Sequence, residues 1–156
     1  FKNVLVTISA DAIGPRFEYI RREADWDKFL ENLAFLQNTN FNIRLNSVFF
    51  IASALHLTDT QQFFYDNYGI TDFTINQVKM GHSMIQCRNL PDKVKSLCVE
   101  KMNNHKQRFA DNSNLVGQLN SCLAELQNPR EEPYTDFFES FANKTSVNWR
   151  NIFTEL

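Results

Sequence analysis

Ser9 and Asp11 are the first residues of this 156-residue chain that could bind a ligand, because they end the aliphatic run VLVTIS (4–9). A serine hydroxyl and a carboxylate can bind the paired hydroxyls of a sugar, and hydrogen bonds to a charged group are the strong ones. Arg16 and Arg21 follow soon after, and a guanidinium can clamp a carboxylate with two parallel bonds. Two simpler interpretations stay open: Ser and Asp are common turn residues, and charged clusters are often only solvated surface.

The elements that must position these residues alternate between strands and helices. The predicted strands are 3–9, 41–51 and 72–78, and the predicted helices between them are 25–37 and 58–69. This order is typical of βαβ units, which form parallel sheets. The run at 3–9 is short and rich in β-branched residues, which predicts a strand buried on both faces.

Polar residues recur late in all three predicted strands. Asn46 interrupts the second strand, and Asn76 and Gln77 close the third. Ligands of open α/β sheets bind at the carboxyl ends of the strands. We therefore expect Ser9, Asn46 and Asn76 to lie near the same end of the sheet.

Local signals place the ends of the helices. Asp25 is expected to cap the helix at 25–37, and Thr58 with Gln61 has the spacing of a capping box. Gly69 stands where a helix-ending glycine belongs. The rest of the chain is predicted to be helical, with segments at 91–109, 113–128 (capped by Ser113), 135–143 and 149–156.

Composition narrows the range of partners and compartments. The formal net charge of −2 predicts neither a nucleic-acid nor a membrane partner. The three cysteines, Cys87, Cys98 and Cys122, are an odd number at wide spacings, which favours free thiols in the cytoplasm over a disulfide framework. No metal site is predicted, since Cys87 and His82 supply too few ligands.

A basic stripe stands at helical spacing in the segment 91–109. It consists of Lys101, His105 and Arg108. No aromatic residues are interleaved with it to stack on bases, so we interpret it as a solvated helix face.

Three stretches together resemble the radical SAM superfamily, in the later half of its partial (β/α) barrel. They are VTISADAIGPRFEYIRREADWDKFLENL, NSVFFIASALHLTDTQQFFYDNYGITDFTINQV and, weakly, the ending NWRNIFTEL. Proteins of this superfamily with a twitch-type cluster domain end in a similar way. The resemblance implies an α/β fold, with half of a partial (β/α) barrel of parallel strands at 1–80 and a helical extension packed on it at 81–156.

The resemblance also implies roles for the residues at the strand ends. Ser9 and Asp11 match a Ser-x-Asp that faces the ribose of S-adenosylmethionine, and Arg21 or Arg16 matches an arginine that meets the methionine carboxylate. Asp11 and Arg21 are then expected to serve the cofactor and not the fold.

The later strands match the same cofactor site. Asn46 matches a residue of the fifth barrel strand that shapes this site. Backbone groups from Asn76 through Gln77 to Val78 match the contact with adenine.

The chain departs from the superfamily in its first half. It has no CxxxCxxC motif to hold a [4Fe–4S] cluster and no Gly-Gly-Glu segment to bind the methionine amine. We therefore expect the C-terminal part of a radical SAM enzyme, whose missing N-terminal half holds the cluster. This part contributes to the reductive cleavage of S-adenosylmethionine to a 5′-deoxyadenosyl radical, and it is inactive alone. The substrate is not predicted.

Two alternatives remain. One is a non-catalytic α/β binding module, or a degenerate remnant that lost its cluster. The other is an unrelated doubly wound nucleotide-binding protein, against which the absence of a Gly-rich loop after a strand counts.

Overall fold

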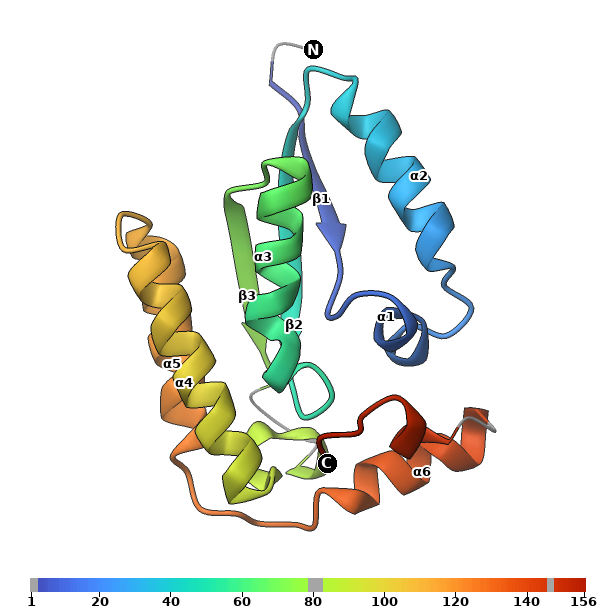
Figure 1. Cartoon of the computed structure of the whole chain (residues 1–156), viewed down its shortest axis with the longest axis vertical. Coiled ribbons are helices and arrows are strands. Elements are labelled where there is room, and N and C mark those ends of the chain that lie inside the picture. The colour runs from blue at the N-terminus through green and yellow to red at the C-terminus, as the bar shows by residue number, and fades with distance from the viewer. Residues whose placement is uncertain (1–2, 79–82, 146–147) are drawn as a thin grey trace.

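The computed structural model in Figure 1 describes residues 3–78, 83–145 and 148–156. The strands are β1 (Leu5–Ser9), β2 (Asn42–Phe49) and β3 (Asp72–Gln77). The α-helices are α1 (Pro15–Ile20), α2 (Trp26–Gln37), α3 (Leu57–Tyr68), α4 (Asp92–Arg108), α5 (Ser113–Leu126) and α6 (Thr135–Thr145). Short 3-10 helices lie at Ala54–His56, Ser83–Ile85, Cys87–Asn89 and Trp149–Asn151.

The three strands form one parallel sheet in the order β1-β2-β3. Ser9 lies opposite Asn46, and Asn46 lies opposite Thr74. The predicted α/β class and the parallel strands in chain order are therefore confirmed.

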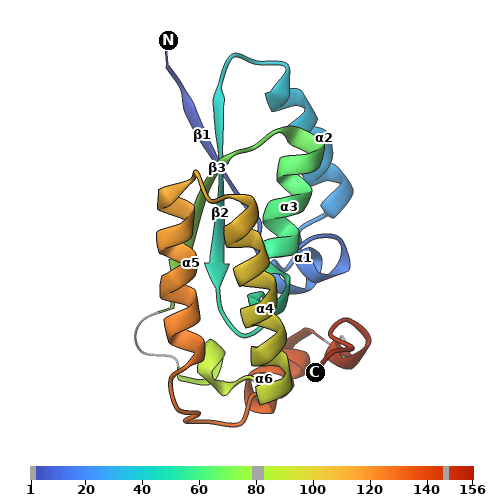
Figure 2. The same ribbon diagram turned by 60° about the vertical axis from the view of Figure 1, so that its left-hand side comes forward.

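The helices cover the sheet unevenly. Helices α2 and α3 lie on the same face of the sheet, and α4 and α5 lie beside β3 (Figures 1 and 2). Helix α6 and the last residues lie beyond the carboxyl ends of the strands (Figures 1 and 2). One hydrophobic core joins the sheet to all these layers, and it includes Leu45 and Phe73 of the strands, Phe64 of α3 and Leu119 of α5.

Only one face of the sheet is buried, so the prediction of a β1 buried on both faces is wrong. On the covered face, Ile8, Leu45 and Phe73 are buried. On the other face, Leu5 is 47% exposed and Thr7 is exposed. We call this second face the open face; its remaining members are Ser9, Asn42, Arg44, Asn46, Val48, Asp72, Thr74 and Asn76, none of them buried. The helices form a single layer against the sheet, so one face of each strand stays uncovered.

The two outer edges of the sheet also differ. The Nε2 atom of Gln118 in α5 donates to the carbonyl of Phe73 at 3.2 Å, and the backbone N–H of Ile75 donates to the Gln118 Oε1 atom. A side-chain amide thus takes the place of a further strand beside β3.

The outer edge of β1 has no such partner. Val4 accepts from Asn42 at 2.9 Å and Ala10 donates to Asn46 at 3.1 Å, so the even-numbered residues of β1 face β2. The backbone groups of Leu5, Thr7 and Ser9 then face away from the sheet. Among the described residues, no strand pairs with this edge.

Helix boundaries confirm some capping predictions and correct others. Asp25 accepts the N–H of Lys28 at 2.9 Å, and Gly69 ends α3 with a left-handed φ of 64°. Thr58 is not a cap, because α3 begins at Leu57 and Thr58 is buried.

The start of α5 and two short segments also differ from prediction. Asn112, not Ser113, caps α5 by accepting the N–H of Leu115 at 3.0 Å. Helix α1 was not predicted, and the ending at 149–156 is one 3-10 turn followed by irregular backbone. In the described ranges, no helix has both the length and the apolar character that a membrane crossing needs.

Candidate functional site

A row of polar side chains crosses the open face near the carboxyl ends of the strands. The Nδ2 atom of Asn46 donates to the Ser9 hydroxyl at 3.4 Å, and the Nδ2 atom of Asn76 donates to the Asn46 Oδ1 atom at 2.6 Å. The prediction that these three residues lie near one end of the sheet is confirmed. The row offers amide and hydroxyl groups, which suit a ligand with hydroxyls and ring nitrogens.

Asp11 and Arg21 meet just beyond this row. The Asp11 Oδ1 atom accepts the backbone N–H of Val48 at 2.7 Å, and its Oδ2 atom lies 2.9 Å from Arg21 Nη2. Asp11 is only 4% exposed, and its carboxylate continues the pairing with β2 past the end of β1. Asp11 and Arg21 therefore hold the fold, contrary to the expectation that they serve only a ligand.

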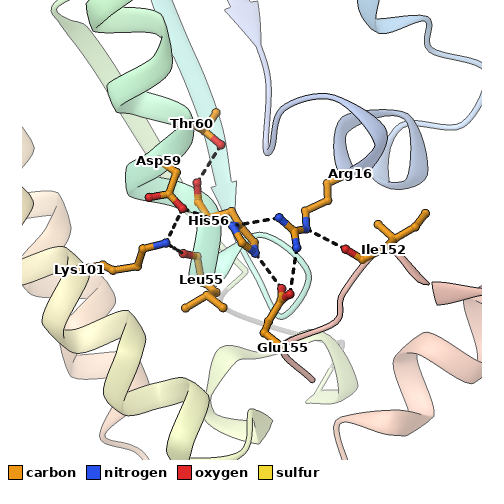
Figure 3. Close-up of polar contacts among 8 residues, drawn as sticks. All are labelled: Arg16, Leu55, His56, Asp59, Thr60, Lys101, Ile152 and Glu155. Atoms are coloured by element: carbon orange, nitrogen blue, oxygen red, sulfur yellow. Dashed lines mark hydrogen bonds and ion pairs between the residues drawn. The ribbon is translucent and has the colours of Figure 1, made fainter. Parts of the chain in front are cut away.

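Gln77 and Arg16 do not join this row. The side chain of Gln77 lies on the covered face and donates to Cys122 Sγ at 3.5 Å. The side chain of Arg16 extends from α1 toward the last residues of the chain (Figure 3).

Arg16 belongs to a charged cluster that ties the end of the chain to α1 and α3, drawn in Figure 3. Its Nη2 atom lies 2.9 Å from Glu155 Oε2, its Nε atom donates to the carbonyl of Ile152 at 3.0 Å, and its Nη1 atom lies 3.3 Å from His56 Nδ1. The Nε2 atom of His56 lies 2.7 Å from Glu155 Oε1. One carboxylate is thus held at both oxygens by a guanidinium and an imidazole.

Asp59 and Lys101 extend the cluster toward α4. His56 Nδ1 lies 3.3 Å from Asp59 Oδ2, which also binds Lys101 Nζ. Lys101 donates to the carbonyl of Leu55 at 3.1 Å. The cluster therefore bridges four segments that lie far apart in the sequence.

The cluster shifts the protonation of its members. Burial opposes the charged form of His56, but hydrogen bonds to Asp59 and Glu155 outweigh it and raise its pKa above the usual value. Burial likewise disfavours the Glu155 carboxylate, and its bond to His56 outweighs this and lowers the pKa of Glu155. Asp59 and Glu155 thus favour a charged imidazole at His56, whereas Arg16, whose Nη1 atom lies 3.3 Å from His56 Nδ1, opposes it.

The predicted basic stripe on α4 is not a solvated face. Lys101 belongs to the charged cluster, and His105 is buried, 4.6 Å from the ring of Phe109. Burial, with a smaller effect of Arg108, lowers the pKa of His105 to about 4. Arg108 pairs with Asp66 on the surface.

The three cysteines lie in the hydrophobic core. All three are free and buried, and burial raises the pKa of Cys98 to about 12 and that of Cys122 to about 11. Metal ligation requires thiolates. Across residues 3–78, 83–145 and 148–156, no three His, Cys, Asp or Glu side chains are grouped as metal ligands would be. His82, considered with Cys87, lies outside the described residues.

His56 and Glu155 were not singled out from the sequence. They are 99 positions apart, and neither stands in a spacing that indicates a shared site. Only the position of a histidine directly before a helix, with an acid three residues later, could have drawn attention to His56.

Comparison with known proteins finds no matching family model, no matching curated protein and no matching solved structure.

Proposed function

We propose that the chain is the C-terminal part of a radical SAM enzyme, and that the open face contributes to its S-adenosylmethionine site. The observation that carries this proposal is the row of Ser9, Asn46 and Asn76 at the carboxyl end of a parallel sheet whose face is uncovered. Parallel sheets are usually covered on both faces, so an uncovered polar face suits a barrel interior. The three strands would be the last three of a partial (β/α) barrel.

In this proposal different residues contact different parts of S-adenosylmethionine. Ser9 binds the ribose hydroxyls, Asn46 shapes the pocket, and the backbone of Asn76 and Gln77 meets the adenine. Asp11, expected to bind the ribose, instead holds Arg21 and the backbone of β2 beside this site. Arg21 is better placed than Arg16 for the methionine carboxylate, because it lies beside Asp11 and no second partner of its guanidinium is seen among the described residues.

The [4Fe–4S] cluster and the rest of the barrel come from an N-terminal half that pairs with the free edge of β1. The [4Fe–4S] cluster would supply the one electron that cleaves S-adenosylmethionine to methionine and a 5′-deoxyadenosyl radical. The residues of this chain hold and orient the nucleoside and exclude water from it. Three buried free thiols are compatible with a reducing compartment, so we place the enzyme in the cytoplasm.

The test compares two asparagines on the open face, in protein that includes the half encoded upstream. Asn76→Ala removes a member of the row, and Asn42→Ala removes an exposed amide at the opposite end of the same face. We expect Asn76→Ala to weaken S-adenosylmethionine binding about fivefold by calorimetry, because it removes the hydrogen bond that positions Asn46, worth roughly 1 kcal/mol. Formation of 5′-deoxyadenosine under reducing conditions should fall with it, whereas Asn42→Ala should change neither. Equal effects of the two variants would refute the site.

A non-catalytic α/β binding module is the second candidate. It is favoured by Asp11, whose carboxylate is buried and bound to Val48 and Arg21 as a structural carboxylate would be. The upstream reading frame separates the two candidates. A CxxxCxxC motif within the length of half a barrel supports the enzyme, and a start codon directly before Phe1 supports the module.

A further inference from the structure

A pocket lies on the helical side of the protein, between α1, α2, α3 and the end of the chain. It has a volume of about 460 Å³, within the range of roughly 300–1,000 Å³ common for small-molecule sites. Its apolar walls are Ile13, Pro15, Trp26, Phe63 and Ile152. Of the described residues that line it, Arg16 alone is charged.

Arg16, which lines this pocket, already binds a carboxylate. Glu155 receives Arg16 at one oxygen and His56 at the other, at 2.9 and 2.7 Å (Figure 3). Two cationic donors on one carboxylate form a strong, oriented site. The arrangement shows that Arg16 can bind a carboxylate.

The rest of the chain end is anchored without Glu155. Phe153 and Trp149 are buried, and the ring of Phe138 lies 5.2 Å from Phe153 and 4.8 Å from Trp149. Rotation of the Glu155 side chain alone would therefore free Arg16 Nη2, while the bond from Arg16 Nε to the carbonyl of Ile152 keeps the guanidinium beside the chain end.

We propose that this pocket binds a small apolar carboxylate, whose charged group replaces that of Glu155 on Arg16. The apolar walls hold the hydrocarbon part, and the exchange leaves the number of charges at Arg16 unchanged. Glu155 acts as an internal competitor that keeps the cationic site occupied in the absence of ligand. This site is separate from the proposed cofactor site and does not depend on it.

The test uses octanoate, with 1-octanol as the uncharged ligand of equal chain length. Binding is followed by the indole N–H resonance of Trp26, and Trp149, which lies outside the pocket lining, serves as the internal reference. We expect octanoate to shift Trp26 saturably and to leave Trp149 in place, and octanol to bind at least tenfold more weakly. Absence of any shift in both the wild type and Glu155→Gln would overturn the proposal.

Three variants test the charge exchange. Glu155→Gln removes the competitor and should tighten octanoate binding severalfold. Arg16→Gln should weaken it at least tenfold, and Arg22→Gln, an arginine outside the pocket lining, should not change it. If Arg16→Gln fails to fold, the Glu155→Gln and octanol results still decide, because equal binding of octanoate and octanol to Glu155→Gln would rule out a carboxylate site.

Discussion

The two outer edges of the sheet, at β3 and at β1, differ in how their backbone groups are satisfied. Beside β3, the amide of Gln118 satisfies two of the backbone groups that face outward, the carbonyl of Phe73 and the N–H of Ile75. Beside β1, the outward groups of Leu5, Thr7 and Ser9 have no partner among the described residues. Unpaired edges invite further strands, and natural proteins commonly cover them. The comparison indicates that β3 ends the sheet, whereas β1 can accept another strand.

The two sides also differ in chemistry. The β1 side is held by charges, with Asp11 on Arg21 and Glu155 on Arg16. The β3 side is held by the neutral amide of Gln118 and the apolar faces of α4 and α5, and its ion pairs Arg44–Asp72 and Arg108–Asp66 are more exposed. Stability of the β1 side should therefore depend on pH and salt more than that of the β3 side.

The largest expected difference is between two prolines on the open face. In Thr74→Pro the lost N–H faces β2, so we expect a loss of about 3 kcal/mol or more in the free energy of unfolding. In Thr7→Pro the lost N–H faces the free edge, where proline is tolerated, and the loss should be about 1 kcal/mol or less. Urea denaturation measures both. Equal losses would mean that the edge of β1 is not free.

Asp11→Ala tests the charged side of the comparison. It removes a buried carboxylate that binds the Val48 N–H and Arg21, and hydrogen bonds to charged groups contribute roughly 1.5–3 kcal/mol. We expect a loss of about 2–3 kcal/mol in the same assay. The matched control is Asp72→Ala, whose ion pair with Arg44 is far more exposed, and which should cost about 0.5 kcal/mol or less. Similar losses in the two variants would contradict the structural role of Asp11.

Gln118→Ala tests the covered edge. It leaves the carbonyl of Phe73 and the N–H of Ile75 without partners, and an unsatisfied buried group costs roughly 1–3 kcal/mol. Because water can reach part of an opened edge, we expect a total loss of about 2 kcal/mol. Asn120→Ala, an exposed residue of the same helix, is the control and should be neutral. If Gln118→Ala does not lower the free energy of unfolding, Gln118 does not close the edge of β3, and this edge is as open as that of β1.

A further difference is a pH dependence of opposite sign at His56 and His105. The raised pKa of His56 gives stability that is present below about pH 6.5 and is lost as the pH rises through the folded value. The pKa of His105, lowered to about 4, gives stability that is present above about pH 6.5 and is lost as the pH falls toward 4.

The two histidines are separated by subtracting variants from the wild type. Unfolding free energies of His56→Gln should differ from the wild type mainly below neutral pH, and the difference should shrink in alkali. The wild type should have a higher free energy of unfolding than His105→Gln, and this difference should disappear in acid. Differences independent of pH in both variants would show that neither histidine changes its protonation behaviour on folding.

Much of the fold was predictable from local patterns. The β-branched runs, Asp25 before an apolar helix and Gly69 after one specified the strands, the helices and their alternation, because backbone sterics and capping act over a few residues. Ser9, Asn46 and Asn76 could be placed at one end of the sheet, because parallel strands in chain order align their carboxyl ends.

The errors came from information that no local pattern contains. The apolar run at 3–9 has the composition of a strand covered on both sides, yet Leu5 and Thr7 face an uncovered side. The same sequence pattern fits either case until the number of helical layers is known.

By itself, then, the sequence determined a parallel α/β sheet with a polar row at its carboxyl end, since these follow from side-chain periodicity and chain order. Only the tertiary structure decided that Asp11 is buried against Val48, that Gln118 closes the edge of β3, and that Arg16 and His56 share Glu155. Each of these contacts joins residues tens of positions apart, and their energies depend on burial and distance, which the chain acquires only when its layers pack together.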